Sequence, residues 1–273
     1  YYYMKNNLSN IKKAIKFLNK NQCVGIPTET VYGLAANAYS SDATAKIFKL
    51  KKRPKKNPLI VHYFNLQLLK KDCEINDNFL KLYKKYSPGP ISYILKLKKK
   101  SLISKNVTSK KNTLAVRFPS HQLTRNLLKQ LNYPLAAPSA NISTKISPVS
   151  KKDVKDEFGK KVKLILDGGQ SRIGVESTII NLINKPKILR LGGIPKDQIK
   201  KYLNTNLAYT KNSEINSPGR EKTHYSPYIK LRLNVKNSNT NEAFILIKKR
   251  KKMYKNYFYL SKIKNLKEAA KNL

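Results

Sequence analysis

The segment KLKKRPKKNPLIVH, residues 49–62, places cationic side chains immediately before an apolar strand that ends on a histidine. Its two prolines restrict the backbone and would hold Lys51 and Arg53 in a stiff loop. Cationic groups held in this way can absorb the negative charge of phosphates. The segment is therefore a candidate site for a phosphorylated ligand, with Asn57 able to hydrogen-bond a phosphate or a backbone group.

The net charge of the chain does not by itself establish this interpretation. The sequence has 57 Lys and Arg against 15 Asp and Glu, a formal net charge of +42, and 49 of the basic residues are lysines. Such a balance is typical of proteins that bind polyanions, but an AT-rich coding sequence would also enrich lysine throughout a chain. Arginine is different, because there are only eight and each offers bidentate hydrogen bonding that lysine cannot make. We therefore interpret Arg53 as functional, and the lysines around it, Lys51 apart, as surface residues.

Further polar residues lie in turns at the ends of predicted strands, the usual place for ligand sites in open α/β sheets. Arg117 ends the apolar strand TLAVRFP and suits a carboxylate, with a buried structural ion pair as the alternative. His62 ends LIVH, where a histidine is more often structural than functional. Thr30 in PTETVYGL offers a hydroxyl. Ser139 and Asn141 lie in APSANIS, which is either a phosphate-binding turn of small donors or a plain Ser/Asn turn.

Several familiar motifs are absent from the sequence. It has no GxxxxGK[ST], GxGxxG, GxSxG or HExxH pattern, so the phosphate-loop, dinucleotide-binding, hydrolase and zinc-protease classes lose their support. Cys23 and Cys73 stand alone, so neither a disulfide framework nor a zinc site is predicted. No apolar run approaches the roughly 20 residues of a membrane span, and the first residues lack the apolar core of a signal peptide. We expect a protein of the reducing cytoplasm with no membrane partner.

Helical and strand patterns alternate along most of the chain, which predicts a mixed α/β fold. Helices are expected at 9–20, capped by Ser9, and at 41–50, 76–86, 121–131 and 196–203. Strands are expected within QCVGIP and PLAAPSA and at 59–64, 91–98, 113–119, 162–168, 177–183 and 187–192. Residues 4–203 would form one domain and 204–228 a linker. Residues 229–273, with two strands and a helix, would form a partial second domain.

Taken together and in order, the motifs resemble the YrdC/Sua5 family, the L-threonylcarbamoyladenylate synthases. The resemblance rests on PTETVYGL, K-x-R-P-x-x-N-P-L-I-V-H, SPGP, A-V-R-x-P, A-P-S-A-N-x-S and the ESTI/LRxG pair, and it covers about residues 20–195. HYSP in the linker resembles the Sua5 branch, whose extra C-terminal domain closes over the site. EAAKNL resembles a segment inside that domain, so we expect a truncated one. The fold implied is a YrdC-like twisted open mixed sheet with flanking helices, plus a partial small α/β C-terminal domain.

The resemblance implies an enzyme that joins L-threonine, bicarbonate or CO2 and ATP into threonylcarbamoyl-AMP and releases pyrophosphate. The product would feed t6A formation on tRNA through a downstream tRNA threonylcarbamoyl transferase complex. Mg²⁺ is implied as a companion of the ATP phosphates. No residues are expected to ligate a metal independently, because the sequence has no DxD-like carboxylate cluster.

The resemblance also assigns residues to each substrate. Lys51 and Arg53 are the expected catalytic residues, because a carbamate oxygen must attack the α-phosphorus of ATP and cations must absorb the charge. The expected L-threonine pocket consists of Thr30, His62, Arg117, Ala137 through its backbone, and Ser177. The expected ATP contacts are Arg53, Asn57, Thr113, Ser139, Asn141, Ser147, Arg190 and Tyr225. Tyr225 belongs to HYSP, in which the neighbouring His224 is an equal candidate.

Two other functions remain open at this point. An RNA-binding module without ATP turnover would use the basic excess and the 17 tyrosines, although the tyrosines do not recur in an RNP-like pattern. A weak affinity for RNA would also be compatible with the enzyme. Carbamoyltransferases of hydrogenase maturation contain YrdC-like domains too, but they add acylphosphatase and zinc-finger segments that this sequence lacks.

Overall fold

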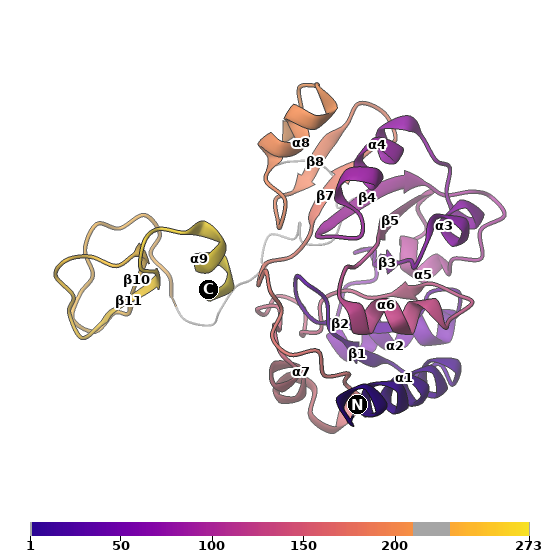
Figure 1. The fold of residues 1–273 in the computed structure, drawn as a ribbon, viewed down its shortest axis with the longest axis horizontal. Coiled ribbons are helices and arrows are strands. Elements are labelled where there is room, and N and C mark those ends of the chain that lie inside the picture. The colour runs from indigo at the N-terminus through magenta and orange to yellow at the C-terminus, as the bar shows by residue number, and fades with distance from the viewer. Residues whose placement is uncertain (1, 210–229, 273) are drawn as a thin grey trace.

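The computed structural model describes residues 2–209 and 230–272 (Figure 1). Its described strands include nine that form one sheet in the order β1-β2-β6-β3-β5-β4-β7-β8-β9. Some neighbours in this sheet are parallel, as in β3 and β5, and others antiparallel, as in β4 and β5. This confirms the expected mixed α/β fold. The strands are β1 (Val24–Ile26), β2 (Gly33–Asn37), β3 (Ile60–His62), β4 (Ile91–Lys96), β5 (Thr113–Arg117), β6 (Leu135–Ala136), β7 (Thr178–Asn181), β8 (Lys187–Arg190) and β9 (Ala208–Tyr209).

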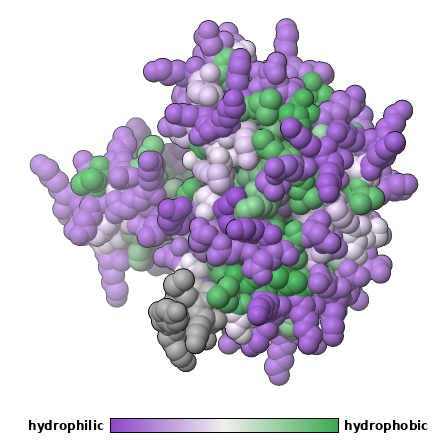
Figure 2. All heavy atoms as spheres, turned by 45° about the vertical axis from the view of Figure 1, so that its right-hand side comes forward, coloured by the Kyte–Doolittle hydropathy of each residue, from purple (hydrophilic) through white to green (hydrophobic). Residues whose placement is uncertain are grey.

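Helices flank this sheet and bury its apolar side chains in two main clusters (Figure 1). The helices are α1 (Tyr2–Asn19), α2 (Ser41–Lys51), α3 (Leu66–Asp72), α4 (Asp77–Tyr86), α5 (Lys105–Thr108), α6 (Gln122–Lys129), α7 (Lys151–Phe158) and α8 (Lys196–Leu203). Ile11 of α1 and Leu127 of α6 share one cluster with β1, whereas Ile47 of α2 and Phe79 of α4 belong to the larger one. Hydrophilic side chains cover most of the face seen in Figure 2.

The C-terminal residues form a smaller unit at one end of the molecule (Figure 1). It contains β10 (Phe244–Lys248) and β11 (Tyr257–Ser261), which pair in parallel, and α9 (Leu266–Asn272). These are the two strands and the helix that the sequence predicts. The unit touches the main one at Gly174, where a Cβ atom would lie 2.7 Å from the carbonyl oxygen of Ala270. None of the helices in the described residues is long and apolar enough to cross a membrane.

The central strands divide their side chains between an apolar face and a buried face that also carries polar residues. Val61 and Val116 lie in the large core cluster, and the residue one position along each strand points to the opposite face. That opposite face carries His62 of β3, Arg117 of β5 and Ser92 of β4. The register pairs Arg117 with both His62 and Ser92, so these three polar residues form one row across three strands.

The structure corrects two expectations about the first half of the chain. Helix α1 begins at Tyr2, so Ser9 lies inside the helix and does not cap it. PTETVYGLAANA, interpreted as a turn, contains β2. The sequence pattern did not predict β2, because GLAAN is a run of small residues without alternation of polar and apolar side chains. Four of its five residues are buried.

Three further differences concern the second half of the chain. The predicted strand at 162–168 makes only a single bridge, between Ile165 and Gly25, because the short strand β1 meets it at one residue. Helix α7 was not expected, since KKDVKDEF buries only Val154 and Phe158. Strand β9 falls within the segment expected as a linker, where it extends the sheet next to β8.

A glycine substitution tests the packing behind β7. We expect Gly192→Ala to lower the free energy of unfolding by about 3 kcal/mol, because its Cβ would lie 2.2 Å from the carbonyl oxygen of Glu176 and 2.5 Å from the carbonyl carbon of Ser177. The matched control is Gly33→Ala, whose nearest contact would be an ordinary 3.4 Å. Urea unfolding of both variants measures the difference, and equal stabilities would contradict the packing described here.

Candidate active site

A cleft opens on the polar face of the central strands. Its enclosed space is about 30 Å³, and the space including its open mouth is about 480 Å³. Side chains of β3, β5 and β8 meet there with the PTETVYGL turn, the APSANIS turn and the two residues just before β7. The residues that line it are Thr28, Thr30, Val31, Tyr32, Gly33, Arg53, Ile60, His62, Arg117, Ala137, Pro138, Ser139, Glu176, Ser177 and Arg190.

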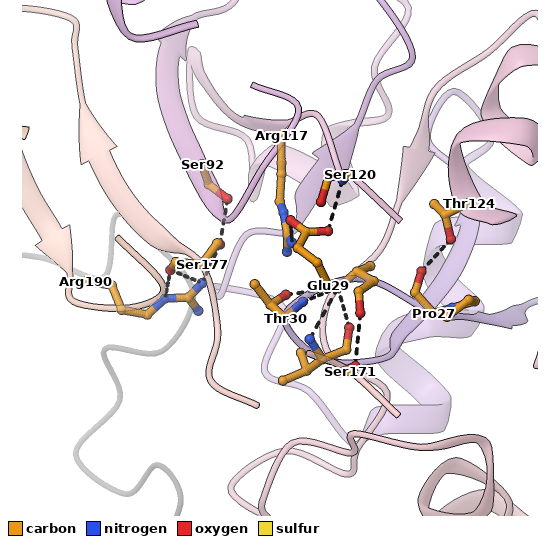
Figure 3. A network of polar contacts seen from close by, with 12 residues as sticks. Pro27, Glu29, Thr30, Ser92, Arg117, Ser120, Thr124, Ser171, Ser177 and Arg190 are labelled. Carbon is orange, nitrogen blue, oxygen red and sulfur yellow. Dashed lines mark hydrogen bonds and ion pairs between the residues drawn. The ribbon is translucent and has the colours of Figure 1, made fainter. Parts of the chain in front are cut away.

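A buried ion pair lies beside this cleft. Nη2 of Arg117 lies 2.7 Å from Oε1 of Glu29, and the side chains are only 5% and 2% exposed (Figure 3). The backbone N–H of Ser120 donates to Oε2 of Glu29 at 3.0 Å. Burial alone would raise the pKa of Glu29, but the charge and hydrogen bond of Arg117 more than offset it and the pKa is lowered. Glu29 is therefore an anion, and it fixes the guanidinium in one orientation.

The ion pair does not use every donor of Arg117. Its Nε is buried and has no hydrogen-bond partner among the described residues. Nδ1 of His62, the neighbour of Arg117 in the row of polar residues, is likewise buried without a partner among those residues. An unpaired buried polar atom costs about 1–3 kcal/mol. Two such atoms on adjacent strands, both on residues that line the cleft, are the kind of feature that a polar ligand would satisfy.

His62 is held in its neutral form. Burial, helped by the positive charge of Arg117, lowers its pKa to about 3, while Glu29 acts in the opposite direction. The ring is 2% exposed and stands at the end of β3 between Arg117 on β5 and Leu135 on β6. A neutral imidazole at this place can accept or donate a hydrogen bond without adding charge to the cleft.

Ser177 and Arg190 form a second polar cluster, at the start of β7 and the end of β8. Nη2 of Arg190 donates to Oγ of Ser177 at 3.0 Å, and Oγ of Ser177 lies 2.8 Å from Oγ of Ser92 (Figure 3). Arg190 also forms a charge-assisted hydrogen bond with the carboxylate of Glu176. Oε1 of Glu176 accepts from the hydroxyl of Ser147 at 3.0 Å. These contacts hold Arg190 at the cleft wall.

The loop after α2 positions Arg53. Its Nε donates to the carbonyl oxygen of Asn57 at 3.0 Å, and its Nη2 donates to Oδ1 of Asn57 at 2.6 Å and to the carbonyl oxygen of Pro58 at 2.9 Å.

Thr113 lies at the end of the sheet where β3 and β5 begin. Because Ile60 pairs with Ala115 in parallel register, Thr113 sits level with Pro58, away from the end that carries His62 and Arg117.

Lys51 takes a different position from Arg53. Its ammonium group is buried and donates to the carbonyl oxygen of Ser139 at 2.6 Å and to that of Asn141. Burial, followed by the positive charge of Arg53, lowers the pKa of Lys51 to about 7, against the opposing influence of Glu176 and Glu157. Lys51 does not line the cleft described above, and its contacts hold the APSANIS turn in place.

The structure thus brings most of the expected site residues together. All five residues expected around L-threonine line the cleft, as do Arg53, Ser139 and Arg190 of the expected ATP contacts. Asn57 supports Arg53, Ser147 supports Glu176, and the side-chain nitrogen of Asn141 bonds within its own turn. The expected residues that do not line the cleft are Asn57, Ser147, Asn141, Thr113 and Lys51. Tyr225 and His224 lie outside the described residues.

Sequence reasoning missed two acidic residues, Glu29 and Glu176. Each pairs with an arginine of the site, Arg117 and Arg190 respectively. The signal was available, because only 15 acidic residues stand against 57 basic ones and both of these lie inside quoted motifs. In the part of the chain that the structure describes, no cluster of three His, Cys, Asp or Glu side chains could hold a metal ion.

Comparison with known sequences covers nearly the whole chain. Residues 16–192 match the profile of Sua5_yciO_yrdC, described as telomere recombination, and residues 194–273 match that of the threonylcarbamoyl-AMP synthase C-terminal domain. The chain is 40% identical over 226 residues to the threonylcarbamoyl-AMP synthase of Pyrococcus abyssi, covering 80% of this chain and 65% of the relative. It is 40% identical over 224 residues to that of Bacillus subtilis, covering 80% and 64%. The chain thus spans slightly under two thirds of these relatives.

Comparison with solved structures agrees with this result. The crystal structure of P. abyssi Sua5 complexed with L-threonine matches with a TM-score of 0.86 and 33% identity, over 96% of this chain and 82% of that one. Full-length HypF in a phosphate- and nucleotide-bound form matches with a TM-score of 0.59 and 21% identity, over 67% of this chain and 29% of that one. The second likeness concerns the fold alone.

The neutral state of His62 predicts a specific pH dependence of stability. The pKa of His62 is about 3 in the folded state and about 6.5 in the unfolded state. As the pH falls below 6.5, the unfolded state therefore binds a proton at His62 while the folded state does not. We expect the free energy of unfolding to fall by about 1.4 kcal/mol per pH unit from this group between pH 6 and 4. Urea unfolding of wild type and His62→Gln would measure it as their difference. An unchanged slope in His62→Gln would contradict the prediction.

The contacts of Lys51 predict that it acts through stability. We expect Lys51→Met to lower the free energy of unfolding by about 2 kcal/mol, because the carbonyl oxygens of Ser139 and Asn141 lose their donor. Lys52→Met, one residue along and exposed, is the matched control and should change stability by less than about 0.5 kcal/mol. A Lys51→Met variant as stable as wild type would show that the ammonium does not anchor the turn.

Proposed function

Since the chain belongs to the Sua5/YciO/YrdC family, we propose that it is an L-threonylcarbamoyladenylate synthase. It would condense L-threonine, bicarbonate or CO2, and ATP into threonylcarbamoyl-AMP. The observation that carries this proposal is the pairing of two kinds of group at one cleft. Buried, partly unsatisfied polar atoms of His62 and Arg117 lie on the central strands, and the cationic side chains of Arg53 and Arg190 lie at the cleft walls.

We assign the buried end of the cleft to L-threonine. The carboxylate of the amino acid would accept a hydrogen bond from the unpartnered Nε of Arg117, with the Ser177 hydroxyl as a second donor. Neutral His62 would bond the amino group through Nδ1. Thr30 and the backbone at Ala137 would border the small side chain, because both residues line the cleft. The P. abyssi relative crystallised with L-threonine supports this assignment.

We assign the other end of the cleft to ATP. Arg53, held by Asn57, and Arg190, held by Glu176 and Ser177, would neutralise phosphate oxygens. The APSANIS turn would contribute the Ser139 hydroxyl and backbone groups. In this assignment Lys51 is a positioning residue for that turn. Asn57 and Ser147 also act through the residues they support, and Thr113 lies near the Arg53 loop.

The reaction then follows from the placement of the two substrates. The threonine amine would add to CO2, or to bicarbonate with loss of water, and form a carbamate. A carbamate oxygen would attack the α-phosphorus of ATP, forming one P–O bond while the bond to the pyrophosphate leaving group breaks. Both partners are anions, so the arginines would lower the barrier by stabilising the negative charge in the transition state.

Mg²⁺ would enter the site as part of the substrate, bound to the ATP phosphates. This fits the donor set, because within the described residues no carboxylate cluster could hold the ion independently. The product would pass, in the cytoplasm, to a tRNA threonylcarbamoyl transferase complex for t6A synthesis. A weak affinity for RNA is compatible with the net charge of +42, but no observation favours an RNA-binding module over the enzyme.

The proposal predicts threonine-dependent release of pyrophosphate. The chain, given ATP, Mg²⁺ and bicarbonate, should release pyrophosphate at least tenfold faster when L-threonine is present. Arg53→Ala should reduce this rate at least a hundredfold, because an arginine at a phosphate typically contributes several kcal/mol in the transition state. An enzyme-coupled phosphate assay measures the rate after pyrophosphatase treatment.

Lys55→Ala is the matched control for this experiment. It removes one positive charge from the same loop, and its side chain is exposed. Its rate should stay within twofold of wild type. A folded chain that releases no pyrophosphate, or one in which Arg53→Ala and Lys55→Ala behave alike, would refute the assignment.

A further inference from the structure

A second large cavity lies outside the cleft and shares none of its lining residues. It measures about 440 Å³ and is bordered by the end of α1, the last turns of α2, the 3-10 turn after α7 and the segment that follows it. Five lysines line it, and we name it the lysine cavity after them: Lys46, Lys49, Lys52, Lys161 and Lys163. Its size is that of a small-molecule site.

The charge of the lysine cavity is almost uncompensated. Among the residues that the structure describes, Glu157 is the one acidic residue that borders it. Both carboxylate oxygens of Glu157 are already engaged, Oε1 by the N–H of Ile142 at 2.9 Å and Oε2 by Nζ of Lys145 at 3.2 Å. None of the five cavity lysines forms an ion pair with another residue that the structure describes. Four of the five lysines are exposed and Lys46 is half-buried, so their positive charge lies around the mouth of the cavity, where it attracts an anion.

The floor of the lysine cavity is apolar and partly aromatic. Phe158 and Cys23 are buried there, and Phe17, Leu50 and Ile142 are half-buried. An inorganic phosphate would satisfy the lysines but leave this floor uncovered. A ligand that carries both a phosphate and a flat aromatic ring would use both parts, because bases stack on phenylalanine while ammonium groups hold the phosphate.

Lys52 connects the lysine cavity with the candidate active site. It caps α2 in the left-handed conformation, with φ 49° and ψ 39°, where glycine is the usual residue. It stands between Lys51, whose side chain anchors the APSANIS turn, and Arg53, which lines the cleft. Ile142 forms a similar connection, because it belongs to that turn and borders the cavity. The two sites are therefore connected through residues 51–53 and the APSANIS turn.

From these observations we propose that the lysine cavity is a second binding site, which takes a nucleoside phosphate. The phosphate is held by Lys46, Lys49 and Lys163, and the base stacks on Phe17 and the floor around it. The recognised unit is one nucleotide, which either a free nucleotide or the end of an RNA chain supplies. The site is separate from the substrate site of the proposed enzyme.

Protection of the lysines from acetylation tests the proposal in the full chain. The probe is adenosine 5′-monophosphate, and the readout is the acetylation rate of each lysine by mass spectrometry. We expect saturating nucleotide to slow acetylation of Lys46, Lys49 and Lys163 at least threefold, while exposed Lys12, outside the cavity, reacts at an unchanged rate. A 5′-phosphorylated RNA trinucleotide, used in parallel, distinguishes an RNA end from a free nucleotide by the stronger protection.

Four variants identify the source of the protection. Arg53→Ala should leave the protection of the lysines unchanged, because Arg53 does not border the lysine cavity. This expectation holds whether or not the cleft binds ATP. Lys49→Glu should weaken nucleotide affinity at least tenfold, whereas Lys12→Glu, with the same change of net charge, should not. Phe17→Leu should weaken it about fivefold or more through lost stacking.

Four results would overturn the proposal. The first is no protection of the cavity lysines in the wild type. The second is equal protection by pyrophosphate, which would indicate counter-ion binding without base recognition. The third is loss of protection in Arg53→Ala, which would place its origin in the cleft. The fourth is an equal effect of Lys49→Glu and Lys12→Glu, which would reduce the attraction to net charge.

Discussion

The buried ion pair between Glu29 and Arg117 is the interaction on which the cleft depends. It ties the PTETVYGL turn to the end of β5, and the carboxylate also accepts the N–H of Ser120. The backbone oxygen of Glu29 accepts from Ile173, so a third segment of the chain joins the same point. Removing one partner of such a pair leaves an uncompensated buried charge, which typically costs 3–5 kcal/mol. The same contact fixes the guanidinium so that its remaining donors serve the cleft.

The cleft illustrates how a strongly basic chain uses its few acids. Glu29 and Glu176 are each paired with an arginine that lines the cleft, and each accepts a further hydrogen bond from Ser120 or Ser147. A carboxylate in this role orients an arginine without fully cancelling its field, because the guanidinium has five donors and the carboxylate occupies only some of them. Orientation, and not the amount of positive charge, is what separates the site arginines from the lysines of the surface.

Sequence patterns predicted the mixed sheet and most central elements, because β3, β4 and β5 are apolar runs bounded by turn residues. They failed at β2, where small residues buried on both faces show no alternation, and at α7, where only Val154 and Phe158 mark the buried side. Motif resemblance grouped Thr30, His62, Arg117 and Ser177, and all four line one cleft. It could not predict that the ammonium of Lys51 would donate to the carbonyl oxygens of Ser139 and Asn141, because a motif does not show which backbone atoms a side chain meets.

Lys51 has a consequence for how this sequence can change over evolutionary time. Among the residues described, it is the one buried lysine, and its compact ammonium fits between two carbonyl oxygens. A guanidinium is larger and planar, so arginine could not replace it there without moving the turn. Nucleotide composition can therefore exchange lysine and arginine almost freely over the exterior of the molecule. At position 51 the same exchange would displace the turn that Lys51 anchors, so we expect this lysine to tolerate replacement least.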